Sequence, residues 1–322
     1  MPILDMPLKE LQKYKGINPC PKDFDAYWKI ALAELDKQSL EYELEEVESI
    51  YKGVKLYNLT FTGVDNAKIY CKFLTPSIID EKLPAIAMFH GYNCTCGEWF
   101  DKTVYAQNGF VVAAMDVRGQ NGLSEDTLQS TGTTSQGHII KGALDKDPQK
   151  LMYRNIFLDT AQLVRILQSM DIVDENRIGA TGSSQGGALT LACAALAPQV
   201  KSIAFAYPFL CDFKRVWEMD LLKGGAFNEL YDYFRFRDPR HEKEDELWAR
   251  LGYIDLQNHA KNIKANCLLF TALMDQICPP STQFAAYNKI KAKKDFIVYP
   301  DFSHEYLPDQ NEITLQYFMK TL

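Results

Sequence analysis

The 322-residue sequence has no long apolar run and no basic cluster. No stretch of about 18 or more apolar residues occurs, so the sequence predicts no transmembrane helix. With 42 acidic against 35 basic residues, the net charge is −7, and the basic patches typical of nucleic-acid-binding proteins are missing. We therefore expect neither a membrane nor a nucleic acid as partner.

The eight cysteines lack the spacing of a disulfide framework, because they are scattered along the chain. Cys94 and Cys96 form the only close pair, and zinc sites usually have longer spacings and a second pair of ligands. Residues 1–15 also lack the apolar core of a signal peptide. We expect reduced thiols, no metal site and a cytoplasmic protein.

Apolar residues make up 47% of the sequence, enough for a large core. Many of them lie in segments with one of two strand patterns. Apolar and polar residues alternate in three early segments, which predicts antiparallel strands with one solvated face. These segments are 42–49, 56–62 and 68–74. Later segments are continuously apolar, which predicts buried parallel strands. These are 83–90, 110–115, 176–182, 200–206, 266–273 and 295–299.

Helical segments alternate with the parallel strands, so we predict an α/β fold with an open, doubly wound, mostly parallel sheet. The predicted helices are 22–38, 98–108, 153–170, 188–197, 281–291 and 309–319. In the first of them, Ile30 belongs to the apolar periodicity that we expect to face inward. Two segments stand apart: a Gly/Ser/Thr-rich loop at 117–145 and an aromatic-rich helical insertion at 209–262.

We expect one domain over 1–322, with an N-terminal arm and helix at 1–40 and the insertion lying over the carboxyl edge of the sheet.

Residues 182–186 read Gly-Ser-Ser-Gln-Gly between a buried strand and an apolar helix. In that context, a glycine-flanked serine is typical of a nucleophile on a sharp strand-to-helix turn. Ser184 is therefore the candidate nucleophile. The Gln185 N–H would lie at the first turn of the helix, where unpaired donors stabilise negative charge.

A nucleophilic serine needs a base and an orienting acid, which follow it in the order acid, then histidine. His304 and Asp275 each follow a predicted late strand and meet this requirement, unlike the other four histidines. Asp295 precedes its strand, and Asp301 would have to fold back, so both are weaker candidates for the acid. A second oxyanion donor is expected after strand 83–90, where the Tyr92 N–H is the candidate.

Three short signatures in order resemble those of the acetyl xylan esterase/cephalosporin-C deacetylase family, carbohydrate esterase family seven of the α/β-hydrolase superfamily. They are Arg118-Gly119-Gln120, Gly182-Ser183-Ser184-Gln185-Gly186 and His304-Glu305. Family members often have glycine where Ser183 stands. The resemblance spans essentially the whole chain, and its α/β-hydrolase part covers about residues 80–322.

The resemblance implies the α/β-hydrolase fold and a cofactor-free serine esterase for short acetylated xylo-oligosaccharides and small acetylated molecules such as cephalosporin C. It implies Ser184, Asp275 and His304 as triad and the Tyr92 and Gln185 N–H groups as oxyanion hole. It assigns structural roles to Arg118, Gly119, Gln120 and Glu305, and implies a homo-hexamer with active sites facing an inner cavity. Other α/β-hydrolase activities, such as a thioesterase or peptidase, and a catalytically silent binding protein remain alternatives.

Overall fold

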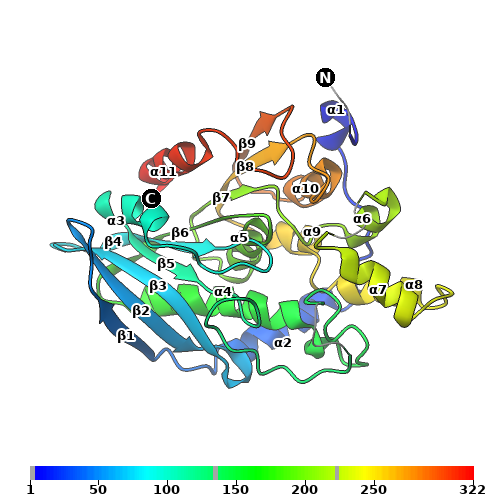
Figure 1. Ribbon diagram of the computed structural model, residues 1–322, viewed down its shortest axis with the longest axis horizontal. Helices are drawn as coiled ribbons and strands as arrows, with labels where there is room; N and C mark the ends of the chain where they lie inside the picture. Colours follow the sequence, from blue (N-terminus) through cyan, green and yellow to red (C-terminus); the bar gives the residue numbers. More distant parts are fainter. Residues whose placement is uncertain (1–3, 133–136, 222–224) are drawn as a thin grey trace.

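The computed structural model describes residues 4–132, 137–221 and 225–322, and it contains one nine-stranded mixed sheet (Figure 1). The strand order is β1-β2-β3-β5-β4-β6-β7-β8-β9. All pairs from β5 onward in this order are parallel, whereas β1, β2, β3 and β5 pair antiparallel. The predicted fold class is confirmed.

The parallel half of the sheet is built from the continuously apolar segments. Its strands are β4 (Leu83–Phe89), β5 (Val111–Met115), β6 (Val173–Ser183), β7 (Ser202–Ala206), β8 (Asn266–Ala272) and β9 (Lys294–Tyr299). Every residue of β5 and β7 is buried, because helices cover both faces. Strand β6 begins three residues earlier than predicted, because Val173, Asp174 and Glu175 extend it at its amino end.

The antiparallel strands are β1 (Tyr42–Val47), β2 (Val54–Thr62) and β3 (Lys68–Pro76). They match the three alternating segments of the sequence to within two residues at each end. Strand β1 forms one edge of the sheet and is largely exposed, whereas buried residues recur along β2 and β3. One face of this half is therefore solvated, as the alternation predicts.

Helices cover the two faces of the parallel half. α4 (Met152–Ser169) and α5 (Gln185–Leu196) pack on one face, with α2 (Phe24–Leu35) outside α4 (Figure 1). α3 (Phe100–Gln107) and α11 (Gln310–Thr321) lie on the other face, and α10 (Pro280–Tyr287) packs against β8. In α2 the expected burial of Ile30 is wrong: its side chain is 59% exposed, because the buried stripe runs through its neighbours Trp28 and Ala31.

The insertion is helical in its described residues. It contains α6 (Phe213–Met219), α7 (Asn228–Phe236), α8 (Glu244–Leu251), α9 (Leu256–His259) and the 3₁₀ turn η3 (Ala260–Asn262). Three further short helices are α1 (Leu8–Leu11), η1 (Val64–Asn66) and η2 (Pro148–Lys150). The assignment of 1–322 to a single domain stays a prediction.

In the described ranges, no helix combines the length and the apolar character needed to span a bilayer.

Candidate active site

Ser184 occupies a strained turn between β6 and α5. Its φ of 57° and ψ of −120° lie in a region that non-glycine residues rarely adopt. The turn is also tightly packed: a Cβ atom on Gly182 would lie 2.5 Å from the carbonyl carbon of Gly186, and one on Gly186 would lie 2.1 Å from the Phe89 oxygen. Both positions therefore require glycine, and the half-buried Ser184 side chain lies at the carboxyl end of β6.

His304 and Asp275 meet Ser184 in a chain of hydrogen bonds. His304 Nε2 lies 3.0 Å from Ser184 Oγ, and His304 Nδ1 lies 2.8 Å from Asp275 Oδ2. Since a carboxylate can only accept, Nδ1 carries the proton and Nε2 is free to accept from the serine. Imidazole and carboxylate are thus arranged to remove a proton from Ser184.

The Asp275 carboxylate is held in place by backbone donors of its own loop. It is fully buried, and its Oδ1 atom accepts hydrogen bonds of 2.8 Å from the backbone N–H groups of Ile277 and Cys278. The two rival acids lie elsewhere. Asp295 is exposed near the start of β9 and accepts from the Phe296 N–H, and Asp301 is exposed in the turn after β9. Of the three candidates, only Asp275 contacts His304.

The other four histidines make contacts elsewhere and do not bind Ser184. His90, after β4, accepts from the Val117 N–H at Nε2 and therefore donates from Nδ1 to the Gly91 oxygen. Burial lowers its pKa, which keeps the ring neutral. His259 is fully buried in the aromatic core, His241 pairs with Glu244 on the insertion surface, and His138 contacts Tyr92.

The two predicted oxyanion donors find no hydrogen-bond acceptor among the residues that the structure describes. Within the described segments, neither the Tyr92 N–H nor the Gln185 N–H donates a hydrogen bond. Gln185 is the first residue of α5, where the helix dipole adds positive potential. The Gln185 side chain also reaches towards the Gly91 oxygen at 3.3 Å, so the loop after β4 lies against this helix terminus.

Arg118 holds the start of the long loop in the core. Its guanidinium forms a bidentate ion pair with Asp159 of α4, both bonds 2.6 Å, and donates to the Val64 oxygen. Arg118 and Asp159 are both fully buried. Burial raises the pKa of Asp159, and the opposing charge of Arg118 moderates that rise.

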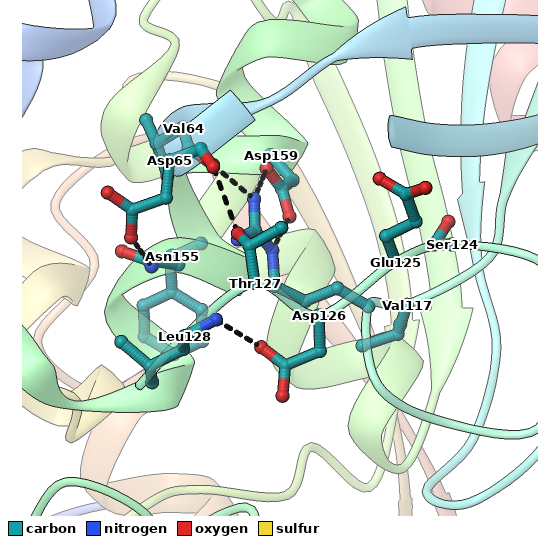
Figure 2. A network of polar contacts seen from close by, with 12 residues as sticks. Val64, Asp65, Val117, Ser124, Glu125, Asp126, Thr127, Leu128, Asn155 and Asp159 are labelled. Carbon is teal, nitrogen blue, oxygen red and sulfur yellow. Dashed lines mark hydrogen bonds and ion pairs between the residues drawn. The ribbon is translucent and has the colours of Figure 1, made fainter. Parts of the chain in front are cut away.

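The segment that follows Arg118 is docked on the same region, as Figure 2 shows. Thr127 Oγ1 donates to the Asp65 oxygen at 3.0 Å, and Asn155 of α4 donates to the Asp65 carboxylate at 2.8 Å. The Leu128 N–H donates to Asp126. Arg118 and Thr127 thereby fix the first part of the 117–145 loop to η1 and α4.

Gln120 links the loop to the nucleophile turn. Its amide donates to Gln185 Oε1 at 2.7 Å, and its oxygen accepts from the Asn93 N–H at 2.9 Å. The Gly119 oxygen lies 3.0 Å from His138 Nε2. Glu305 accepts from the Ser303 N–H at 2.9 Å, and its backbone oxygen accepts from Tyr207. Gln120 and Glu305 therefore form hydrogen bonds with residues adjacent to Ser184 and His304, namely Gln185 and Ser303.

A cavity of about 890 Å³ opens beside Ser184 and His304. Residues of α3 and α11, among them Phe100 and Gln310, line its sides. The space next to the serine is large enough for a small organic substrate.

Comparison with known proteins identifies the family. The profile described as Acetyl xylan esterase (AXE1) matches residues 1–322. The chain belongs to the acetyl xylan esterase family.

Two solved structures of this family resemble the chain along nearly its whole length. Acetyl Xylan Esterase 1 from Thermoanaerobacterium sp. JW/SL YS485 is 50% identical with a TM-score of 0.95, and the match covers 98% of this chain and 99% of that chain. The acetyl xylan esterase from Paenibacillus sp. R4 is 33% identical with a TM-score of 0.94, and the match covers 98% of this chain and 100% of that chain.

A curated relative is longer. Acetyl esterase Axe7A from Xylanibacter ruminicola is 26% identical over 289 residues, which are 88% of this chain and 63% of that protein. The chain thus matches somewhat less than two thirds of the length of this relative.

Several residues at this site were not predicted from the family signatures. The Tyr207 ring lies 4.5 Å from the His304 ring, and Gln310 of α11 donates to Ser183 Oγ at 3.1 Å. Tyr153 of α4 donates to Gln185 Oε1 at 2.8 Å. These three residues come from the segment after β7, from α11 and from α4, and no sequence spacing joins them to the Ser184 turn.

One group in the described ranges has the composition of a metal site: Asp275, Cys278 and His304. Asp275 and His304 already form a hydrogen bond with each other. Burial raises the pKa of the Cys278 thiol well above its ordinary value. All eight cysteines are unpaired. The donor atoms of this group are therefore better suited to the hydrogen-bond chain than to zinc, which a cysteine binds only as a thiolate.

Proposed function

We propose that this chain is a serine esterase that removes acetyl groups from short acetylated xylo-oligosaccharides and from small acetylated molecules such as cephalosporin C. The observation that carries the proposal is the continuous contact Asp275–His304–Ser184 at the carboxyl edge of the sheet. Membership of the acetyl xylan esterase family supports the acetyl group as the acyl part.

In the proposed mechanism, His304 takes the Ser184 proton as Oγ attacks the acetyl carbonyl carbon. The oxyanion that forms accepts hydrogen bonds from the Tyr92 and Gln185 N–H groups. The C–O bond to the sugar then breaks, and the sugar oxygen leaves with the proton from His304. Asp275 keeps the imidazole in the required tautomer and stabilises its positive charge.

Water completes the reaction. His304 removes a proton from a water molecule, which attacks the acetyl-enzyme on Ser184. The second tetrahedral intermediate releases acetate, and the proton returns to Ser184. Apart from the substrate and water, these proposed steps use only groups of the chain itself.

The subunits are proposed to assemble as a homo-hexamer with the active sites facing an inner cavity. The exposed edge strand β1 supports an assembly, since edge strands in proteins are usually covered or paired. Closed symmetry is the usual outcome for such assemblies. An inner cavity would admit oligosaccharides and exclude polymeric xylan.

A fluorophosphonate probe followed by a substrate panel tests the proposal. We expect labelling of the wild type and of Ser183→Gly, but not of Ser184→Ala; the adjacent serine is a matched control. Acetylated xylo-oligosaccharides should then be hydrolysed faster than thioesters or amides. Faster thioester or amide cleavage would favour another hydrolase activity, and an unlabelled wild type would indicate a silent binding protein.

A further inference from the structure

A buried carboxylate of the helical insertion joins three segments behind the Tyr92 loop. Glu229 of α7 is only 5% exposed. One of its oxygens lies 3.0 Å from the Tyr92 hydroxyl oxygen. The other accepts from the Ile139 and Ile140 N–H groups, at 2.8 and 2.9 Å. Glu229 therefore connects the insertion, the long loop and the loop after β4.

His138 contacts the same tyrosine from the long loop. Its Nδ1 atom lies 3.0 Å from the Tyr92 hydroxyl oxygen, and its Nε2 atom lies 3.0 Å from the Gly119 oxygen. The Tyr92 ring packs edge-to-face on the His138 ring at 5.2 Å and against Phe209 at 5.6 Å. The side chain of Tyr92 is thus fixed at its hydroxyl and along its ring.

We propose that Glu229, together with His138, is a positioning residue that holds the Tyr92 backbone N–H in the direction of the oxyanion. The inference rests on the proposed function, because it assigns a purpose to a donor of the proposed oxyanion hole. Neither side chain touches the reacting atoms. Both would act through Tyr92, whose N–H must be preorganised if it is to stabilise charge without moving during the reaction.

The hydrogen bonds around the Tyr92 hydroxyl require one proton more than ionised Glu229 and neutral His138 provide. His138 Nε2 faces a carbonyl oxygen, so it carries a proton. The Tyr92 hydroxyl has one proton and faces both Glu229 and His138 Nδ1, so it can donate to only one of them. Every contact is satisfied only if one additional proton resides on Glu229 or on Nδ1. With ionised Glu229 and neutral His138, one hydrogen bond is lost.

The surroundings place that proton on Glu229. Burial raises the pKa of Glu229 to about 7 and lowers the pKa of His138 from its ordinary value. The nearby titratable groups are Tyr92, Tyr153 and Asp232 around Glu229, and Lys141 and Asp126 around His138. Asp232 raises the pKa of Glu229 and Lys141 lowers that of His138. The chain of contacts is then complete below about pH 7 and loses one bond above it.

Three variants, assayed with para-nitrophenyl acetate at about pH 6 and about pH 8.5, test the inference. Glu229→Ala should lower kcat on the order of 10- to 100-fold while KM changes less than about threefold. Its affinity for a boronic acid, which forms a tetrahedral adduct with the serine, should fall by the same factor. Asp232→Asn, on the same helix, is the matched control and should stay within about twofold of wild type at each pH.

Glu229→Gln is the conservative variant that separates positioning from folding. Its amide group can donate to Tyr92 as a protonated carboxyl would, and its oxygen can accept from the Ile139 and Ile140 N–H groups. We expect nearly wild-type kcat at about pH 6 and a ratio of variant to wild-type kcat that rises towards about pH 8.5. A ratio that does not change with pH would contradict the extra proton on Glu229. This comparison tests the inference even if Glu229→Ala fails to fold.

The inference is overturned if folded Glu229→Ala keeps kcat and boronic-acid affinity within about twofold of wild type. It is also overturned if Asp232→Asn lowers kcat as much as Glu229→Ala does. The proposed function fails separately: a wild type that hydrolyses para-nitrophenyl acetate but not acetylated xylo-oligosaccharides leaves the Glu229 measurement intact. A wild type that neither hydrolyses the ester nor binds the boronic acid would overturn both.

Discussion

His304 Nε2 lies 3.0 Å from Ser184 Oγ, although 120 residues separate them in the sequence. The contact exists because β6 and β9 are parallel strands of one sheet, and the segments that follow them emerge at the same edge. The residue that follows β8, Leu273, donates its N–H to Tyr299 at the end of β9, which brings the Asp275 loop under His304. Sheet topology thus gathers three side chains that share no local motif.

The choice of acid can be tested by two substitutions. Asp275→Asn should lower kcat on the order of 10⁴-fold, because an asparagine amide would turn His304 to the wrong tautomer. Asp301→Asn should have a much smaller effect, since this exposed side chain does not contact His304. Steady-state kinetics on an acetyl ester measure both. A larger loss for Asp301→Asn would show that the assignment of the acid is wrong.

Acyl-chain selectivity tests the walls of the site. The long loop and the helical insertion meet at Tyr92 through His138 and Glu229, so we expect little room for acyl chains longer than acetyl. Acetyl esters should be hydrolysed faster than butyryl and hexanoyl esters of the same alcohol. Rates that increase with chain length would instead indicate an open, lipase-like groove.

The buried ion pair between Arg118 and Asp159 should be required for stability. Arg118→Met would leave the Asp159 carboxylate buried without its partner, at a cost of about 3–5 kcal/mol in the free energy of unfolding. Adding Asp159→Leu should restore part of the loss, because no buried charge then remains unpaired. Urea denaturation measures these differences.

Arg240→Met is the control for that experiment. Its ion pair with Glu242 is exposed on the surface, so its removal should change stability much less. Equal effects of Arg118→Met and Arg240→Met would contradict a special role of the buried pair.

The size of the substrate tests the proposed assembly. If the active sites face an inner cavity, acetyl release from short xylo-oligosaccharides should be much faster than release from polymeric xylan, at equal acetyl concentration. Light scattering should report a particle well above the 36.7 kDa monomer. A monomer in solution would contradict the hexamer, and equal rates on both substrates would contradict the cavity.

The fold was predictable from the sequence to the extent that local patterns determine it. Alternating and continuous apolar segments distinguish β2 from β5, and the glycines around Ser184 mark the turn, because only glycine fits between the strands and the helix. The early start of β6 was missed, since the polar residues Asp174 and Glu175 separate Val173 from the predicted segment. In the structure Val173 pairs with Leu83 of β4 and the register then shifts to Ala85 and Ile178, a pairing that local propensity does not reveal.

The surroundings of the site were harder to predict. Arg118 was expected to be structural, but its partner Asp159 lies in a helix, where an aspartate carries no signal of burial. Glu229 lies in the helical insertion and His138 in the long loop, and their contacts with Tyr92 depend on how these two segments pack. Such contacts are determined by tertiary structure, so one sequence alone does not reveal them.

The most direct test of the account is to identify the acetylated residue in enzyme quenched during turnover of an acetyl ester. Peptide mapping by mass spectrometry should find the mass of one acetyl group on the peptide containing Ser184, fragmentation should place it on Ser184 and not on Ser183, and Ser184→Ala should lose the modification together with at least about 10⁴-fold in kcat. A Ser184→Ala protein that is folded and still turns over the ester at a substantial rate, or an acetyl group on another residue, would contradict the account.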